Sequence, residues 1–132
     1  MLGKIFLTLD AMGLLFGAPI ADMNETHQYN PRWPPHAKFH NAQTILLSVM
    51  LGLVTLYFTW RRCESPLLKQ QSSYIAMLCG SLYWLAGCCA PLFPGASGLD
   101  PEFGGPAFPQ LPIFTTFLGC AVVGGICELY NI

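Results

Sequence analysis

The sequence predicts an all-α membrane protein, a four-transmembrane-helix bundle with two longer loops on one side. Two observations carry this prediction. Apolar residues make up 53% of the chain and charged residues only 10%, whereas a soluble protein has about 25% charged residues. Four mainly apolar runs are also long enough to cross a bilayer, which takes about 20 residues. We therefore expect residues 1–132 to form a single integral membrane domain.

Segments with turn and helix-stop chemistry separate the four apolar runs. A proline cluster at 31–35 precedes the second run, a short polar loop ending in Pro66 precedes the third, and a long glycine- and proline-rich segment precedes the fourth. The predicted helices cover about residues 4–21, 34–60, 73–93 and 111–130.

The first run resembles a secretory signal, because its apolar stretch ends in small residues at 18–21. However, Asp10 interrupts the apolar region and Pro19 lies inside the would-be cleavage motif, and both features are unusual in a signal. We therefore expect this run to be retained as the first helix.

The distribution of basic residues predicts the orientation in the membrane. Four crossings place both termini and the loop after the second helix on one side of the bilayer. That side carries Lys4, Arg61, Arg62 and Lys69, and the other side carries Arg32 and Lys38. This bias predicts cytosolic termini, and we expect the endoplasmic reticulum as the location. No clustered basic face indicates nucleic-acid binding.

Most of the titratable chemistry gathers in one polar segment, residues 22–40, which contains all three histidines. Proline is favoured in the first turn of a helix, so the second helix is expected to begin near Pro34 or Pro35. That start places His36 and His40 on one helical face at the membrane surface. His27 can approach them from the loop, and Asp22 lies where the first helix leaves the membrane.

This constellation predicts general acid–base chemistry without a cofactor. A carboxylate and a histidine in a partly desolvated pocket can exchange protons near neutral pH. The predicted catalytic residues are Asp22, His27, His36 and His40, with Asp22 as the base or as the group that orients an imidazole. The residues expected to contact substrate are Asn24, Tyr29, Arg32 and Trp33.

Other interpretations of these residues stay open. His36 and His40 also fit histidines at a membrane interface, or metal ligands, although we predict no metal site. Asp10 and Glu128 are secondary candidates, because an acid within a membrane helix is costly to bury and is a functional hypothesis by default. Pairing with Arg61 or Arg62 would explain both acids structurally.

Cysteine and glycine in the helices are predicted to serve packing. The six cysteines form no Cys-x-x-Cys pair and none lies in a long loop, which argues against a thiol oxidoreductase. Small residues let helix backbones approach closely where lipid gives no hydrophobic drive to association. The glycines expected at close helix contacts are Gly80, Gly87, Gly119, Gly124 and Gly125.

The segment 24–40 carries a resemblance to a known family. Its pattern, Asn24-x-Thr26-His27-x-x-Asn30-Pro31-x-Trp33-Pro34-Pro35-His36-Ala37-x-Phe39-His40, resembles the signature of small four-helix integral membrane proteins, mostly fungal and bacterial, classed as a domain of unknown function. In size and helix count the chain is also similar to small fungal membrane epoxide hydrolases, cyclases and isomerases of polyketide and terpenoid pathways. The resemblance implies a pathway enzyme without naming its reaction.

The residues and the resemblance together favour a membrane enzyme that opens an epoxide on a lipophilic terpenoid or polyketide, by hydrolysis or cyclisation. Two alternatives stay open. One is a double-bond isomerase of the emopamil-binding type, which shares the helix count but no convincing motif. The other is a non-catalytic subunit that binds lipid or assists assembly. The expected partners are a lipophilic substrate and membrane lipid, and the sequence allows a homo-oligomer.

Overall fold

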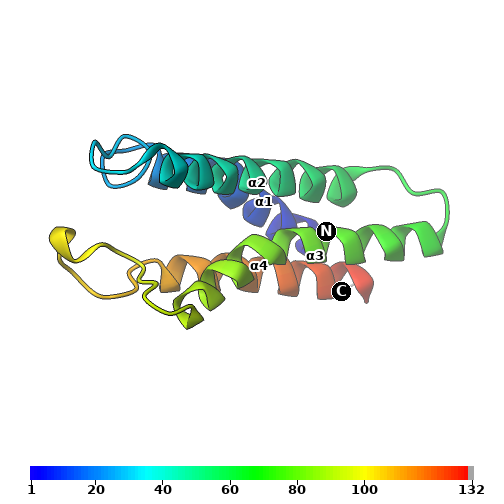
Figure 1. Ribbon diagram of the computed structural model, residues 1–132. Coiled ribbons are helices and arrows are strands. Elements are labelled where there is room, and N and C mark those ends of the chain that lie inside the picture. Colours follow the sequence, from blue (N-terminus) through cyan, green and yellow to red (C-terminus); the bar gives the residue numbers. More distant parts are fainter. Residues whose placement is uncertain (131–132) are drawn as a thin grey trace.

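The computed structural model describes residues 1–130 and contains four long α-helices. Each helix is long and apolar enough to span a membrane. Two short 3-10 turns lie between the last two long helices: η1 directly follows the third helix, and η2 lies within the long loop before the fourth (Figure 1). The long helices are α1 (Leu2–Asp22), α2 (Pro35–Trp60), α3 (Pro66–Cys89) and α4 (Leu111–Leu129), and the turns are Ala90–Leu92 and Pro101–Phe103. The predicted all-α bundle of four membrane-spanning helices is confirmed.

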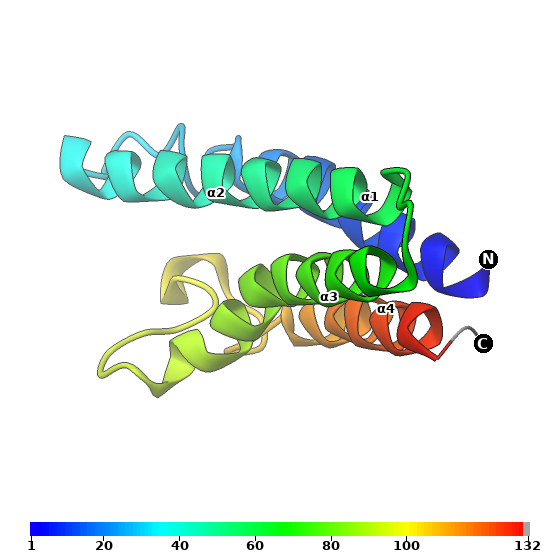
Figure 2. The same cartoon turned by 90° about the vertical axis from the view of Figure 1, so that its right-hand side faces the viewer.

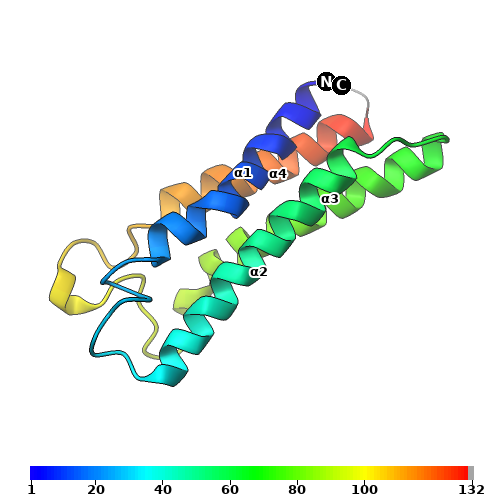
Figure 3. The ribbon, with the colours of Figure 1, turned by 90° about the horizontal axis from the view of Figure 1, so that it is seen from above.

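The helices run alternately up and down, so that consecutive helices lie side by side. Helix α1 packs against α2 and α4, and α3 packs against the same two helices (Figure 2). The loops 23–34 and 93–110 meet at one end of the bundle, while the start of α1, the end of α4 and the loop 61–65 lie at the other (Figures 1 and 3). The two longer loops therefore share one side, as the sequence predicts.

The helix starts follow proline and capping chemistry. Helix α2 begins at Pro35 after the extended Pro34, as expected for proline in a first turn. The prediction for the third helix was wrong at its start: α3 begins at Pro66, about two turns before residue 73. The Ser65 side chain accepts a hydrogen bond from the backbone N–H of Leu68 at 3.3 Å, and this cap starts the helix in the polar loop, before the apolar run.

The bundle suits a lipid surround, with many large apolar side chains outside and small or polar side chains packed with Leu7, Leu14 and Trp84 between the helices. Leu9, Leu53 and Leu78 are each more than half exposed. Ser48 is fully buried and donates a 2.7 Å hydrogen bond to the Leu14 carbonyl oxygen, which joins α2 to α1. Because lipid is as apolar as leucine, association of the helices depends on such close contacts and interhelical hydrogen bonds.

The glycine prediction is confirmed where a side chain would collide with a neighbouring helix. A Cβ atom at Gly124 would lie 2.9 Å from the Gly3 carbonyl oxygen and 3.0 Å from the Leu7 backbone nitrogen. Comparable collisions occur at three more of the predicted positions, Gly80, Gly87 and Gly125. The prediction for Gly119 was wrong, because nothing lies within 4 Å of a Cβ atom there. Its place on α4 faces away from the other helices.

Candidate functional site

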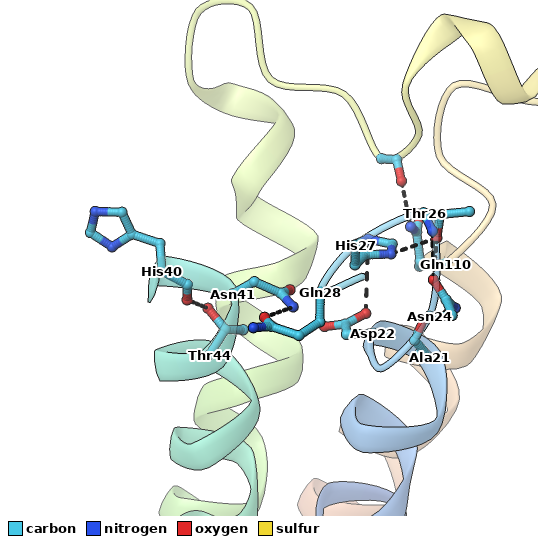
Figure 4. Close-up of polar contacts among 11 residues, drawn as sticks. Ala21, Asp22, Asn24, Thr26, His27, Gln28, His40, Asn41, Thr44 and Gln110 are labelled. Carbon is cyan, nitrogen blue, oxygen red and sulfur yellow. Dashed lines mark hydrogen bonds and ion pairs between the residues drawn. The ribbon is translucent and has the colours of Figure 1, made fainter. Parts of the chain in front are cut away.

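The loop between α1 and α2 is a compact set of turns. The backbone N–H of Gln28 donates to the Asp22 carbonyl oxygen at 3.0 Å, and that of Tyr29 donates to the Asn24 carbonyl oxygen at 2.8 Å. The Asn41 side chain on α2 donates to the Gln28 side chain at 3.1 Å, which ties the loop to the helix (Figure 4). These contacts fold the loop back over the end of α1 and fix the positions of its side chains.

A chain of side-chain hydrogen bonds orients His27 within this loop. Asn24 donates from Nδ2 to the Ala21 carbonyl oxygen at 2.7 Å, and its Oδ1 accepts the Thr26 hydroxyl at 2.7 Å. Thr26 Oγ1 also lies 2.7 Å from His27 Nδ1. Because the single hydroxyl proton of Thr26 points at Asn24, Nδ1 must supply the proton for its own contact. His27 therefore holds a proton on Nδ1 and turns Nε2 away from Thr26.

His27 Nε2 faces the carboxylate of Asp22. The distance from Nε2 to Asp22 Oδ1 is 3.9 Å, and both side chains are partly buried, with 27% and 17% of their surfaces exposed. This separation suits an ion pair and is longer than a hydrogen bond. Since Nδ1 already carries a proton for its contact with Thr26, Nε2 is the nitrogen left to act toward Asp22. Figure 4 shows the two side chains pointing toward one another.

Trp33 connects this pair to an open cavity of about 440 Å³ at the loop end of the bundle. The Trp33 ring meets the His27 ring edge-on, with centroids 5.6 Å apart. Across the cavity, Arg32 pairs with Glu102 of η2, and this ion pair joins the two long loops. Asn30 is buried and its Oδ1 accepts the Arg32 backbone N–H at 2.9 Å, which holds the turn in place.

His36 and His40 form a separate pair. They lie on one face of α2, as predicted, with their Nε2 atoms 3.0 Å apart, and both are exposed. Figure 4 shows His40 directed away from Asp22 and His27. Within residues 1–130, neither histidine lies within ion-pair distance of an acid. No three His, Cys, Asp or Glu side chains in that range come together as a metal site.

The residues expected to contact substrate have different surroundings. Trp33 lines the cavity, and Arg32 is engaged by Glu102. Asn24 lies behind Thr26 and orients the histidine instead of facing the cavity. Tyr29 is 56% exposed and does not line the cavity beside Trp33. The structure thus brings together Asp22, Asn24, His27 and Trp33 and leaves Tyr29 outside.

The two acids within the helices do not pair with Arg61 or Arg62, and that part of the interpretation was wrong for the described residues. Asp10 is fully buried and accepts a hydrogen bond from Trp84 Nε1 at 2.6 Å, while its Oδ2 has no partner. Glu128 lies 3.7 Å from the amino group of Met1. Helix α3 places Trp84 opposite Asp10, whereas Arg61 turns toward Ser72 in a 2.7 Å hydrogen bond.

Two contacts were not predicted, one within the site and one between the helices. Thr26 lay within the segment singled out by the sequence, but only the turn at 24–27 shows that it bridges Asn24 and His27. From the sequence, Trp84 is indistinguishable from an ordinary core aromatic residue in a membrane helix. Its partner, Asp10, is far away in the sequence. An indole N–H that is buried needs an acceptor, and Asp10 was an available acceptor at similar depth in another helix.

The comparisons with known proteins place the chain in a family. The model of the family of unknown function DUF6640 matches residues 7–129. The chain belongs to this family. The match covers α2, α3, α4, both long loops and all but the first residues of α1, so the fold described above is that of a DUF6640 member. No curated protein and no solved structure matches the chain.

Proposed function

We propose that this chain is a multi-pass membrane enzyme that performs acid–base chemistry on a lipophilic terpenoid or polyketide, with epoxide opening as its reaction. The observation that carries the proposal is the Asp22–His27 pair. Its two side chains are partly buried at the membrane boundary and face each other at 3.9 Å, so one can donate a proton to a substrate while the other accepts one. The resemblance in size and helix count to small membrane epoxide hydrolases and cyclases of natural-product pathways supports the same class.

His27, Asp22 and one water molecule supply and accept every proton that epoxide hydrolysis requires. His27 Nε2–H gives its proton to the epoxide oxygen as the ring C–O bond breaks. Asp22 takes a proton from the attacking water as the new C–O bond forms, and the proton then passes from Asp22 to Nε2. Substrate and water become a diol, and an internal hydroxyl in place of water gives a cyclic ether. Thr26 and Asn24 are positioning residues that keep Nε2 toward Asp22.

The setting suits a substrate that arrives from the bilayer. Asp22 is the last residue of α1, a helix that can span the membrane, so the pair lies where lipid meets the loops. Trp33 gives an apolar wall between the cavity and His27. We place this end in the lumen of the endoplasmic reticulum and both termini in the cytosol, because the opposite end carries most of the basic residues.

Single substitutions of Asp22 and of each histidine test the proposal. Microsomes with the full chain are fed a panel of terpenoid and polyketide epoxides, and products are measured by mass spectrometry and NMR. We expect Asp22→Asn and His27→Gln each to lower turnover by about 100-fold or more, the range for general acid–base catalysis. His36→Gln and His40→Gln are matched controls and should keep full turnover, because the structure separates them from Asp22.

Thr26 supplies a second test that separates positioning from folding. Thr26→Val removes the Nδ1 partner at nearly constant volume, so turnover should fall and Thr26→Ser should restore it. Hydrolysis adds one water to the mass of the product, whereas cyclisation and double-bond isomerisation leave the mass unchanged and are separated by NMR. Full turnover by His27→Gln, with well-folded protein, would refute the assignment of the pair.

A further inference from the structure

A second cavity, of about 470 Å³, opens at the opposite end of the bundle from the Asp22–His27 pair. It lies where the loop 61–65 and the ends of α1 and α4 meet, and Figure 3 shows these segments gathered at one end. Its volume falls within the range of about 300–1,000 Å³ that is typical of small-molecule sites. Residues from all four helices contribute to its walls.

The charge of this cavity is strongly one-sided. Four of the six basic residues of the chain line it, together with one acid, Glu128. That acid lies 3.7 Å from the amino group of Met1, so a cation already accompanies it. An anion in the cavity would therefore meet a surplus of positive charge. The basic residues are Lys4, Arg61, Arg62 and Lys69.

Two of these cations are held in place by the surrounding side chains. Arg61 donates from Nε to Ser72 at 2.7 Å, and its guanidinium lies 4.9 Å from the centre of the Phe58 ring. Lys4 lies 4.9 Å above the Trp60 ring, whose Nε1 donates to Thr8 at 2.9 Å. Contacts of this kind pre-organise a site, because less side-chain freedom is lost when a ligand binds.

We infer that this cavity binds a phosphate group, carried by a lipid headgroup or by a free phosphate, at the membrane surface. The planar guanidinium of arginine matches phosphate geometry with paired N–H donors, and lysine adds point charge. Basic pockets between membrane helices on the cytosolic side suit phosphorylated headgroups. The half-exposed Trp60 beside Lys4 marks the interface where such headgroups lie. This site is independent of the proposed epoxide chemistry.

Cys63 provides a native reporter inside the cavity. Its Sγ lies 3.3 Å from Ser72 Oγ, and this contact lowers the pKa of the Cys63 thiol, with further lowering from Arg61. A bound phosphate would cover the thiol and oppose its ionisation, and both effects slow alkylation. Cys89, exposed at the far end of α3, serves as the reference thiol.

The test measures alkylation of the full chain by N-ethylmaleimide, with mass-spectrometric readout at each cysteine. The chain is placed in phosphatidylcholine vesicles, in the same vesicles containing phosphatidate, or in the first vesicles with inorganic phosphate in the buffer. We expect phosphatidate to slow Cys63 by about tenfold at ten times its Kd, without slowing Cys89. If only phosphatidate protects Cys63 from alkylation, the bound phosphate belongs to a lipid headgroup. If inorganic phosphate protects Cys63 as well, the cavity also binds free phosphate.

A matched pair of variants links the protection to the basic lining. Arg62→Gln removes an exposed cation of the cavity and should weaken the protection severalfold, whereas Lys38→Gln removes a cation at the other end and should leave it unchanged. The inference is overturned if neither phosphatidate nor phosphate slows alkylation of wild-type Cys63. Equal slowing of Cys63 and Cys89 would overturn it as well, and neither outcome depends on a variant that folds.

Discussion

Replacing Gly124 by alanine should weaken the contact between α1 and α4. The added Cβ would lie 2.9 Å from the Gly3 carbonyl oxygen, 2.9 Å from Leu7 Cγ and 3.0 Å from the Leu7 nitrogen. Two of these three atoms belong to the backbone of α1, which cannot turn aside as a flexible side chain can. The helices must therefore separate, and their other contacts loosen with them.

The magnitude follows from two opposing terms. Overpacking a well-packed interior costs about 1–3 kcal/mol, and a backbone neighbour places Gly124 in the upper part of that range. Replacing glycine by alanine inside a helix raises the free energy of unfolding by about 1 kcal/mol. We therefore expect Gly124→Ala to lower the free energy of unfolding by about 1–2 kcal/mol.

Gly119 on the same helix is the matched control, because a Cβ atom there meets nothing within 4 Å. Gly119→Ala should raise the free energy of unfolding by about 0.5–1 kcal/mol through the helix term alone. Both variants are measured by titrating the purified chain in mild detergent with sodium dodecyl sulfate and following helix content. Equal effects of the two substitutions, in either direction, would refute the packing argument.

Two further predictions concern polar contacts. Trp84→Phe removes the one hydrogen bond that the Asp10 carboxyl makes within residues 1–130 and should cost about 1–3 kcal/mol. In a double-mutant cycle measured by the same titration, the Asp10→Ala, Trp84→Phe double variant should lose less stability than the sum of the two single losses. The rate of Cys63 alkylation should rise with pH with a midpoint below that of an ordinary thiol, because contact with Ser72 favours the thiolate. Ser72→Ala should move this midpoint to higher pH. An unmoved midpoint would contradict the role of Ser72.

The fold could be predicted because a bilayer restricts it strongly. An apolar run of about 20 residues has few structures available other than a membrane helix, since every backbone N–H and C=O must find a partner within the segment. Hydropathy therefore located α1, α2 and α4 closely. It placed the start of α3 too late, because the first turns of that helix lie in polar residues and depend on Pro66 and the Ser65 cap.

The candidate site was less predictable because short polar contacts decide it. Helical spacing placed His36 beside His40, and the structure confirms their contact. Spacing could not show that the pair faces away from Asp22, since that depends on how far α2 is rotated about its axis. His27 lies in a loop without periodicity, and its partner is selected by the hydrogen bonds of Asn24 and Thr26.

The placement of charge in this bundle separates two kinds of chemistry. The Asp22–His27 pair holds a carboxylate and an imidazole 3.9 Å apart in the partly buried end of one loop, where we propose proton transfer to and from a substrate. The opposite cavity collects lysine and arginine side chains, which are donors to anions, and so it suits the binding of an anion better than proton transfer. Asp10 lies between the two ends, enclosed by Trp84 and fully buried. The loop end is therefore the end at which we expect catalysis.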